Sequence, residues 1–593
     1  MSRSAAAHSL PRLGDFTTDR RVLILIAMAV FVGSCSTLAA WVLLRMIALV
    51  TNLVWLHTFS SASLSLAGLK PSWWMVLAPA LGGLAIGLMA RFGSEKIRGH
   101  GIPEAIEAIL IGGSRLQPKV AILKPLSSAI SIGTGGPFGA EGPIIMTGGA
   151  IGSLFAQCFS LSAAERKTLL VAGAAAGMTA IFGTPIAAVL VAVELLLFEW
   201  KPRSLIPVIA ACTLSSTLRP YLFGTGSLFP FAGHIDLPWW GLFAFIGVGI
   251  VGGLQSGLLT GLLYKMEDLF GHIPLHWMWW PAIGGIVVGL GGLIEPRALG
   301  VGYDIIGDLL NSHIVISAAI AILLVKSAIW IVALASGTSG GVLAPLLIFG
   351  GCVGWLEGRY LPGDQGAWAL LGMAAMMGGT MRSPLTAILF ALELTGDFAL
   401  LGPLLVATSA SYALTVLLLK RSILTEKIAR RGQHVVREYG IDPFELLRVS
   451  EVMVSKIDTL PASMPVDEAV SFFSGEIPRH KSYPLLDAGG QVVGMVARAD
   501  VLRWRAESPH DDETLFDRAS DRSLTVGYPD EPVSHLADRM VLADVGRVPI
   551  VDRETSQLVG LVARKDLLRM RAVAKSSEAT RVAFFGRAAA AGK

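Results

Sequence analysis

A run of apolar segments, from about Val22 to Leu419, constrains the fold of this 593-residue chain more than any other feature. Some segments are long enough to cross a hydrocarbon core of about 30 Å, whereas others hold only about ten to fifteen residues. The chain is 53% hydrophobic and 16% charged, which is too apolar for a soluble domain. We therefore expect a polytopic membrane protein made of helices, because helices satisfy their own backbone in lipid.

Three of the short segments are interrupted by glycine, and they run from Gly99 to Pro103, from Gly133 to Pro143 and from Gly337 to Pro345. Non-helical backbone is tolerated at membrane depth only where protein buries it or where it lines a polar cavity. These three segments are therefore the candidates for such buried or cavity-lining backbone.

The apolar part of the chain contains an internal repeat. The segment Pro185–Leu195 (PIAAVLVAVEL) matches Pro384–Leu394 (PLTAILFALEL), and Pro143–Gly152 matches Pro345–Gly354. The first residues of the matched blocks differ by 199 and 202 positions. Two halves with broken helices in corresponding places are typical of transporters whose binding site lies between the repeats. Hydropathy alone leaves open whether the repeats are parallel or inverted.

Basic residues cluster on both sides of the apolar part. Such clusters favour the cytoplasmic side of a membrane, so the sequence predicts a multi-pass protein of the cell inner (plasma) membrane with both termini cytoplasmic. Their position beside membrane spans favours this interpretation over a nucleic-acid patch, and no nucleic-acid partner is expected. The clusters are Arg3, Arg12, Arg20 and Arg21 before the spans, and Lys420, Arg421, Lys427, Arg430 and Arg431 after them.

After Arg431 the composition becomes that of a soluble α/β domain with a second repeat. Each copy has the pattern strand, turn, strand, helix. The two copies are Tyr483–Asp487 followed by Val493–Arg503, and Val548–Asp552 followed by Val559–Arg569, with a period of 66 residues.

Three short apolar helices are predicted to begin at Gly99-His-Gly-Ile-Pro103, Gly139-Ala-Glu-Gly-Pro143 and Gly341-Val-Leu-Ala-Pro345. A helix start presents free N–H groups and about half a positive charge, so several that converge form an anion site without a full cation. This suits transport, since a buried arginine would hold the anion too tightly. For any one of these starts taken alone an ordinary helix cap is the favoured interpretation, whereas the three together favour an anion site.

These motifs resemble the CLC family of chloride channels and proton-coupled anion exchangers, and the tail resembles a pair of CBS domains. The resemblance implies an all-α membrane fold of two inverted repeats, a homodimer in lipid, and one pathway per subunit for chloride or a similar small anion. The expected domains are an N-terminal arm (1–20), a transport domain (21–435, with repeats of about 21–225 and 237–435), CBS domains (449–505 and 517–573) and a C-terminal tail (574–593).

By resemblance, Glu141 is the gating glutamate. Its carboxylate is itself an anion that can occupy a site built from helix starts, and protonation frees that site for the substrate. The remaining anion-binding positions implied by the family pattern are His100, Gly101, Ile102, Ala140, Gly142, Val342, Leu343 and Leu424.

Two departures from the family pattern leave selectivity open. His100 stands where chloride-selective members have a serine, and its imidazole either donates to the anion or turns away onto a backbone acceptor. Leu424 stands where the family usually has a tyrosine at the inner mouth, so that hydroxyl donor is missing.

A third departure concerns proton coupling. Leu195 follows Glu194 where the exchangers have a second glutamate as internal proton acceptor. Leucine cannot relay a proton, which favours a channel or a weakly coupled carrier, with an antiporter that uses Glu194, Glu199 or water as the alternative. Glu194 and Glu393 occupy equivalent repeat positions and are predicted to be structural, satisfied by backbone groups at helix ends.

In the tail, Asp500 and Asp566 stand where CBS domains contact a ribose, so an adenine nucleotide is the implied ligand and regulation of transport the implied role. Ala497 and Ala563 replace the Ser or Thr that commonly helps to hold phosphate. The alternative is that both aspartates are helix N-caps. Transport itself requires no cofactor.

Two other classes of CBS-linked membrane protein are disfavoured. An intramembrane metalloprotease needs a His-Glu-x-x-His helix, which the sequence lacks. A divalent-cation transporter needs clustered carboxylates, whereas the spans are nearly free of Asp and Glu. The four cysteines have no metal-ligand spacing. We therefore expect no metal site and no enzymatic activity.

Overall fold

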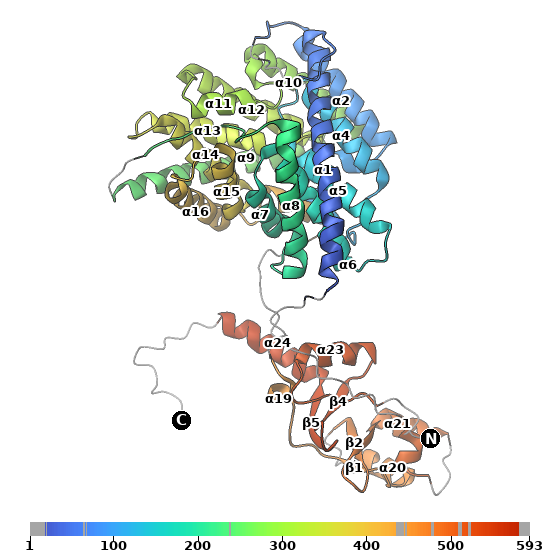
Figure 1. The fold of residues 1–593 in the computed structure, drawn as a ribbon. Coiled ribbons are helices and arrows are strands. Elements are labelled where there is room, and N and C mark those ends of the chain that lie inside the picture. The colour runs from blue at the N-terminus through green and yellow to red at the C-terminus, as the bar shows by residue number, and fades with distance from the viewer. Residues whose placement is uncertain are drawn as a thin grey trace. The chain divides into compact units, whose positions relative to one another are not determined.

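The computed structural model describes residues 18, 20–62, 66, 68–235, 239–433, 444, 447–475, 480–507, 513–519 and 524–579. Most of the predicted N-terminal arm (1–17 and 19), the last two residues of the predicted transport domain with the stretch that follows it (434–443), residues 508–512 between the CBS domains and the end of the tail (580–593) lie outside the described residues. The chain divides into two compact units, Met1–Tyr439 and Gly440–Lys593 (Figure 1).

The first unit is entirely helical where it is described, as expected for a membrane domain (Figure 1). Its first half contains α1 (Val22–Thr51) with the π-helical end η1 (Asn52–Leu56), α2 (Trp74–Phe92), η2 (Glu95–Ile97), α3 (Ile102–Leu110), α4 (Pro118–Gly133), α5 (Glu141–Gln157), α6 (Ala163–Phe182), α7 (Pro185–Val191) with its π-helical end η3 (Ala192–Leu197), and α8 (Pro202–Phe223). Its second half contains α9 (Gly241–Gly271), η4 (Trp277–Trp279), α10 (Trp280–Ile294), η5 (Pro296–Ala298), α11 (Tyr303–Leu310), α12 (Ile316–Ala335), α13 (Leu343–Gly358), α14 (Gln365–Met381), α15 (Pro384–Thr395) and α16 (Leu401–Leu418), and α17 (Ile423–Arg430) follows.

The two halves repeat the same order of long and short helices. The short helices α3 and α11 take the third place in each half, and α5 packs on α6 as α13 packs on α14. Within the described residues, seven helices are long and apolar enough to cross a membrane. The remaining helices are shorter or less apolar, which agrees with the mixture of long and short apolar segments in the sequence.

Two glutamates join the halves reciprocally. Glu393 of α15 accepts the N–H groups of Ile186 (3.0 Å) and Ala187 (2.8 Å) at the start of α7. Glu194 accepts the N–H (3.0 Å) and the hydroxyl (2.6 Å) of Thr386 at the start of α15. Each carboxylate thus satisfies the helix start of the other repeat, which confirms the structural role predicted for this pair.

Two lysines, Lys124 of α4 and Lys326 of α12, are fully buried at equivalent places in the halves. Each ammonium group donates to two backbone carbonyls of the loop that leads into a short helix, α3 or α11, and so fixes that loop. The acceptors are Ile97 (2.9 Å) and Gly99 (2.7 Å) for Lys124, and Ala298 (2.9 Å) and Gly300 (2.9 Å) for Lys326.

The second unit contains two small β-sheets with helices, as the strand, turn, strand, helix pattern predicts. In the first sheet β1 pairs parallel with β2, which pairs antiparallel with β3, and in the second β4 and β5 are antiparallel. Tyr483 faces Val496, and Val548 faces Val562. The elements are α19 (Val449–Val452), β1 (Leu460–Pro461), α20 (Val466–Ser474), β2 (Ser482–Leu486), β3 (Val492–Ala497), α21 (Arg498–Ala506), α22 (Leu515–Ala519), α23 (Val533–Leu542), β4 (Arg547–Val551), β5 (Leu558–Ala563) and α24 (Arg564–Ala579).

Candidate anion site at three helix starts

The three glycine-proline motifs become helix starts. Helix α3 begins after Gly101, whose φ of 91° lies in the region that favours glycine. Helix α5 begins at Glu141 and α13 at Leu343. The loops before all three helices are largely buried, so their backbone groups face protein or a ligand rather than solvent.

Close backbone contacts bring these helix starts together. Gly139 and Gly341 exchange two hydrogen bonds of 3.1 and 2.8 Å, which joins the loop before α5 to the loop before α13. Gly142 of α5 lies against α3, and a Cβ there would come within 1.9 Å of the His100 carbonyl oxygen. Only glycine permits this approach, and the three N-termini converge because of it.

Glu141 occupies the point of convergence. Its side chain is fully buried, and its Oε1 atom accepts the N–H of Ala344 in the first turn of α13 at 2.9 Å. Its Oε2 atom has no hydrogen-bond partner among the described residues. A Cβ on Gly139 would lie 1.9 Å from that oxygen, so bare glycine makes the space that the carboxylate fills. The carboxylate therefore lies where a helix start would hold an anion.

His100 lies directly before α3 and is buried, with 3% of its surface exposed. Its Nδ1 atom is buried without a hydrogen-bond partner among the residues that the structure describes. The ring is therefore not fixed through this atom on a backbone acceptor of the described chain, which leaves Nδ1 available to a small ligand.

Glu104, which the sequence reasoning did not single out, organises the start of α3. Its carboxylate accepts the N–H of Gly101 at 3.0 Å and pairs with Lys427 at 2.8 Å and Arg431 at 3.3 Å. An acidic residue three positions after the N-cap glycine is a capping-box signal that marks this residue in the sequence. The two basic partners come from the region of α17, which is thereby held against α3.

Leu424 is fully buried in the first turn of α17, a helix that packs on α3. The adjacent carbonyl of Ile423 accepts the hydroxyl of Tyr264, which comes from α9, at 2.5 Å. This tyrosine hydroxyl is committed to the backbone, so it does not replace the donor that Leu424 lacks.

A charged cavity of about 570 Å³ lies beside the start of α3. Its charged lining residues are Glu95, Lys96, Arg98, Glu104, Glu107, Arg115, Glu267, Lys427, Arg430 and Arg431. Basic residues outnumber acidic ones in this lining, which favours the entry of anions.

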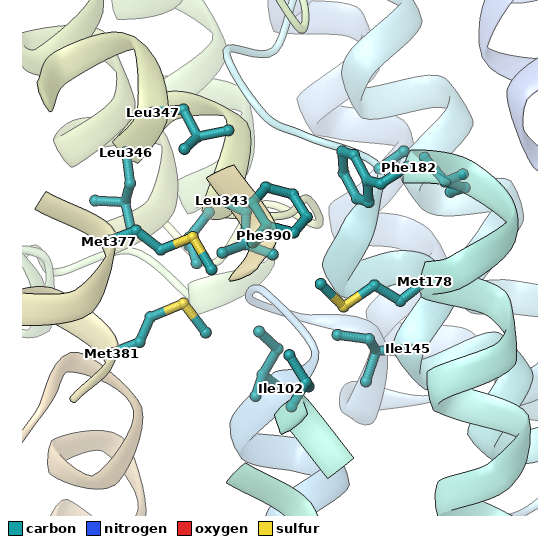
Figure 2. Close-up of a cluster of buried hydrophobic side chains, with 14 of the residues drawn as sticks. Ile102, Ile145, Met178, Phe182, Leu343, Leu346, Leu347, Met377, Met381 and Phe390 are labelled. Carbon is teal, nitrogen blue, oxygen red and sulfur yellow. The ribbon is translucent and has the colours of Figure 1, made fainter. Parts of the chain in front are cut away.

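Apolar side chains surround the helix starts. Figure 2 shows Ile145 and Met178 on one side of this region and Met377 and Met381 on the other, with Leu343, Phe390 and Ile102 between them. All of them are buried. In such surroundings the dipoles of the helix starts act on an anion with little screening by water.

A leucine stands at the position where the resemblance implies an internal proton acceptor in exchangers. Leu195 in η3 is fully buried. Of the two candidate substitutes, Glu194 is bound to Thr386, and Glu199 accepts the Ser204 hydroxyl at 2.7 Å and pairs with Lys167 at 3.3 Å. Both carboxylates therefore already have structural partners.

The predicted nucleotide residues lie at two helix starts of the second unit. Asp500 accepts the N–H of Ala497 at 3.1 Å, and Asp566 accepts the N–H of Ala563 at 2.9 Å. The N-cap positions belong to the alanines, so the suggestion that the aspartates are N-caps is wrong in detail. They stand three residues later and reach back to the cap, as the acidic member of a capping box does.

Two repeats whose broken helices meet at a buried point are typical of membrane transport proteins built from internal repeats. Residues 81–416 match the family model described as voltage gated chloride channel, and residues 449–507 and 522–572 match the CBS domain. The chain therefore belongs to the CLC family of chloride transport proteins, whose members are transporters and channels rather than enzymes, and it carries a CBS pair.

Individual relatives agree with this assignment. The chain is 27% identical to a putative ClcB-like chloride channel protein of Ralstonia nicotianae, over 65% of this chain and 92% of the relative. It is 31% identical to the voltage-gated ClC-type chloride channel ClcB of Salmonella typhimurium, over 61% and 88%. The crystal structure of a slow cyanobacterial Cl⁻/H⁺ antiporter has the same fold, with a TM-score of 0.61 and 23% identity over 70% of this chain and 99% of that one.

Proposed function

We propose that this protein carries chloride or a similar small inorganic anion through the point where α3, α5 and α13 begin, and that Glu141 is the gate. The anion passes His100, Gly101 and Ile102 at the start of α3. It also passes Ala140 and Gly142 beside α5, Val342 and Leu343 beside α13, and Leu424 of α17. In this proposal the protein lies in the inner (plasma) membrane with both termini in the cytoplasm.

The observation that carries the proposal is the hydrogen bond between the Glu141 carboxylate and the N–H of Ala344. A carboxylate that reaches from one helix start to another occupies the place of the transported anion, and the site is closed. Protonation removes the negative charge, weakens the hold of the helix start on the side chain and opens the site to the substrate.

Transport by this protein is channel-like or only weakly coupled to protons. The buried Leu195 and the structural partners of Glu194 and Glu199 support this proposal, because a relay needs a carboxylate that is free to exchange its proton. A proton-coupled antiporter is the second candidate, and the resemblance to a solved Cl⁻/H⁺ antiporter favours it.

The test is chloride release from liposomes that contain the purified protein. Wild-type release should depend on pH, and Glu141→Gln should release chloride at nearly the same rate at every pH. Glu393→Gln is the matched control, since it also removes a carboxylate from a helix start but lies away from the gate, and its release should keep the wild-type pH dependence. A pH-dependent Glu141→Gln variant would refute the gate.

Proton coupling is tested in the same liposomes. A chloride gradient should drive little or no uphill proton movement. A fixed ratio of anions to protons, measured from reversal potentials, would establish the antiporter instead.

The proposal includes a homodimer. Apolar side chains remain exposed on four helices that are equivalent in pairs, α7 with α15 and α8 with α16. These residues are Ile186, Ile206, Ile209, Leu385, Leu401 and Leu405. Cross-linking in native membranes tests whether a second copy covers them, and a monomer would refute this part of the proposal.

The CBS pair is proposed to regulate transport through an adenine nucleotide near Asp500 and Asp566. CBS domains often bind such ligands, although both aspartates already bond to helix starts. Calorimetry with AMP, adenosine and ATP on the C-terminal unit tests binding, with Asp500→Ala and Asp566→Ala as variants. If none of these ligands binds and the two variants change only the stability of the unit, the aspartates are capping residues and not ligand contacts.

A further inference from the structure

A second cavity, of about 520 Å³, lies where the starts of α1, α6 and α8 come together. The first turns of all three helices line it, together with the loop that leads into α6. Helices α1 and α8 pack side by side, and both pack on α6 (Figure 1). Because the long apolar helix α1 begins at this cavity, the cavity lies at one surface of the membrane rather than at its centre.

Most of the residues that line this cavity are polar. They include two arginines, one glutamate and three serines, namely Arg21, Arg203, Glu165, Ser160, Ser162 and Ser204. Glu165 is the one carboxylate of the lining, and it pairs with Arg21 at 2.5 Å and accepts the N–H of Ser162 at 2.7 Å. The negative charge of Glu165 is therefore balanced by Arg21, and the charge of Arg203 is left over.

Arg203, in the first turn of α8, supplies the observation that points to a ligand. Its guanidinium forms no hydrogen bond and no ion pair with any residue that the structure describes, and its Nε atom is buried. The nearby carboxylate of Glu199 is already bound by Lys167 at 3.3 Å and by the Ser204 hydroxyl at 2.7 Å. A partly buried cation without a partner is unfavourable unless a ligand supplies the opposite charge. The cavity is therefore suited to an anionic group.

The corresponding positions of the second repeat are uncharged. Helices α16 and α14 begin at the places that correspond to the starts of α8 and α6. At the offsets that align the two repeats, Arg203 corresponds to Gly402, and Glu165 corresponds to Ala367. The scaffold that the repeats share does not require these charges, which favours a role toward a ligand.

The surroundings of the cavity favour a phospholipid over a soluble anion. Three large apolar side chains next to lining residues in the sequence are mostly exposed, namely Leu23 (65%) and Ile24 (61%) of α1 and Trp200 (64%) before α8. Such side chains contact acyl chains or the headgroup region of a bilayer, and arginine binds phosphate oxygens well. A basic pocket between spanning helices at the cytoplasmic surface is typical of sites for anionic headgroups.

We infer that this cavity binds the headgroup of an anionic phospholipid that has one phosphate diester, such as phosphatidylglycerol. Arg203 holds the phosphate, the serine hydroxyls of the lining bind the polar remainder of the headgroup, and the acyl chains lie along the start of α1. A single negative charge matches the single arginine that lacks a counter-charge. In the orientation proposed above, this lipid belongs to the cytoplasmic leaflet. The site goes beyond the proposed function, since no step of anion transport passes through it.

Lipid binding to the full-length protein in detergent, measured by native mass spectrometry, tests the inference. The wild type should bind dioleoyl phosphatidylglycerol more tightly than dioleoyl phosphatidylethanolamine, which has the same acyl chains and no net charge. In Arg203→Gln, the dissociation constant of the first phosphatidylglycerol should rise about three- to tenfold, while that of phosphatidylethanolamine stays unchanged. Arg203→Lys, which keeps the charge, should stay within about twofold of the wild type.

Ser160→Asp is a second variant that leaves Arg203 in place. Ser160 lies in the exposed part of the loop, so the added carboxylate repels the phosphate without disturbing the packed helices. Its dissociation constant for phosphatidylglycerol should also rise about three- to tenfold, and it decides the question if Arg203→Gln does not fold. Lys119→Gln is the matched control, because it removes an exposed positive charge outside the cavity, and it should bind both lipids as the wild type does.

Equal affinity of the wild type for the two lipids would overturn the inference. So would unchanged phosphatidylglycerol binding in the Arg203→Gln and Ser160→Asp variants, or an equal loss in Lys119→Gln. Displacement of phosphatidylglycerol by an equal concentration of inorganic phosphate would assign the cavity to a soluble anion and overturn the lipid as its occupant. None of these measurements requires transport, so their outcome is independent of the chloride release that tests the proposed function.

Discussion

The two repeats of the membrane unit share their scaffold but differ in their chemistry. Lys124 and Lys326 do the same work in each half, and so do Glu194 and Glu393. These residues form hydrogen bonds with backbone groups that have no access to water inside the membrane. Both halves contain such groups, so both halves need these residues. The gate breaks this symmetry, since Glu141 at the start of α5 corresponds to Leu343 at the start of α13.

The physical reason for a single gate lies in the convergence of the helix starts. Glu141 reaches the first turn of α13, so one carboxylate already serves both repeats. A second carboxylate at Leu343 would lie in the same buried space, where two negative charges cannot both be held. Residues that are the same in both repeats therefore stabilise the fold. Residues that differ between the repeats, such as Glu141 and Leu343, are the ones expected to act on the anion.

The largest effect is expected from the symmetric lysines. Replacement of Lys124 or Lys326 by Met leaves two buried carbonyls without donors, at about 1–3 kcal/mol each. The two variants should therefore lose similar thermal stability in detergent, measured by unfolding fluorescence. Lys96→Met is the control, because Lys96 is exposed. A large loss of thermal stability in only one of the two lysine variants would contradict the proposed equivalence of Lys124 and Lys326.

The reciprocal glutamates should show the next largest effect. In Glu194→Gln and Glu393→Gln, a neutral amide replaces the charged acceptor at a helix start and weakens its hydrogen bonds, and each change should cost about 1.5–3 kcal/mol of unfolding free energy. Melting curves of the two variants should match, while the pH dependence of chloride flux stays that of the wild type. Altered pH dependence in Glu194→Gln would show that this residue carries protons.

An added carboxylate tests the broken symmetry directly. Leu343→Glu places a second acid at the gate, and chloride flux at neutral pH should fall about tenfold and recover on acidification, because protonation removes the repulsion and the block. Leu343→Gln, of the same size without charge, should show no recovery with acid. Equal fluxes in the two variants would mean that charge at this helix start is irrelevant to transport.

The sequence predicted the helix starts and the structural roles of Glu194 and Glu393. Helix starts depend on residues that are close together in the chain, and the repeat is visible when the two halves of the sequence are compared. The pairing of Glu104 with Arg431 was not predictable, since it joins positions 327 residues apart. A cavity of about 520 Å³ where the ends of α1 and α8 meet the start of α11 also escaped prediction, because it depends on how these elements meet in space. In the second unit the pattern located Asp500 and Asp566 at helix starts but misjudged their position within the cap.

The smallest effect concerns the turns of the two CBS copies. Asp552 accepts the N–H of Thr555 (2.9 Å), the Thr555 hydroxyl (3.0 Å) and the N–H of Glu554 (3.0 Å), and these bonds lower the pKa of its carboxyl below the ordinary value. A lowered pKa in the folded state adds stability that is present above the unfolded pKa of about 4 and is lost as the pH falls through the folded pKa.

Asp552→Asn should therefore lower the melting temperature of the C-terminal unit by about 1–3 °C at pH 7, with the difference from the wild type shrinking as the pH falls below 4. Asp487, which holds the corresponding turn through the N–H groups of Gly489 and Gln491, provides the comparison as Asp487→Asn. Asp538→Asn is the exposed control. Calorimetry over a series of pH values measures all three. A difference for Asp552→Asn that is as large at pH 3 as at pH 7 would show that the turn is held by the geometry of the side chain rather than by its charge.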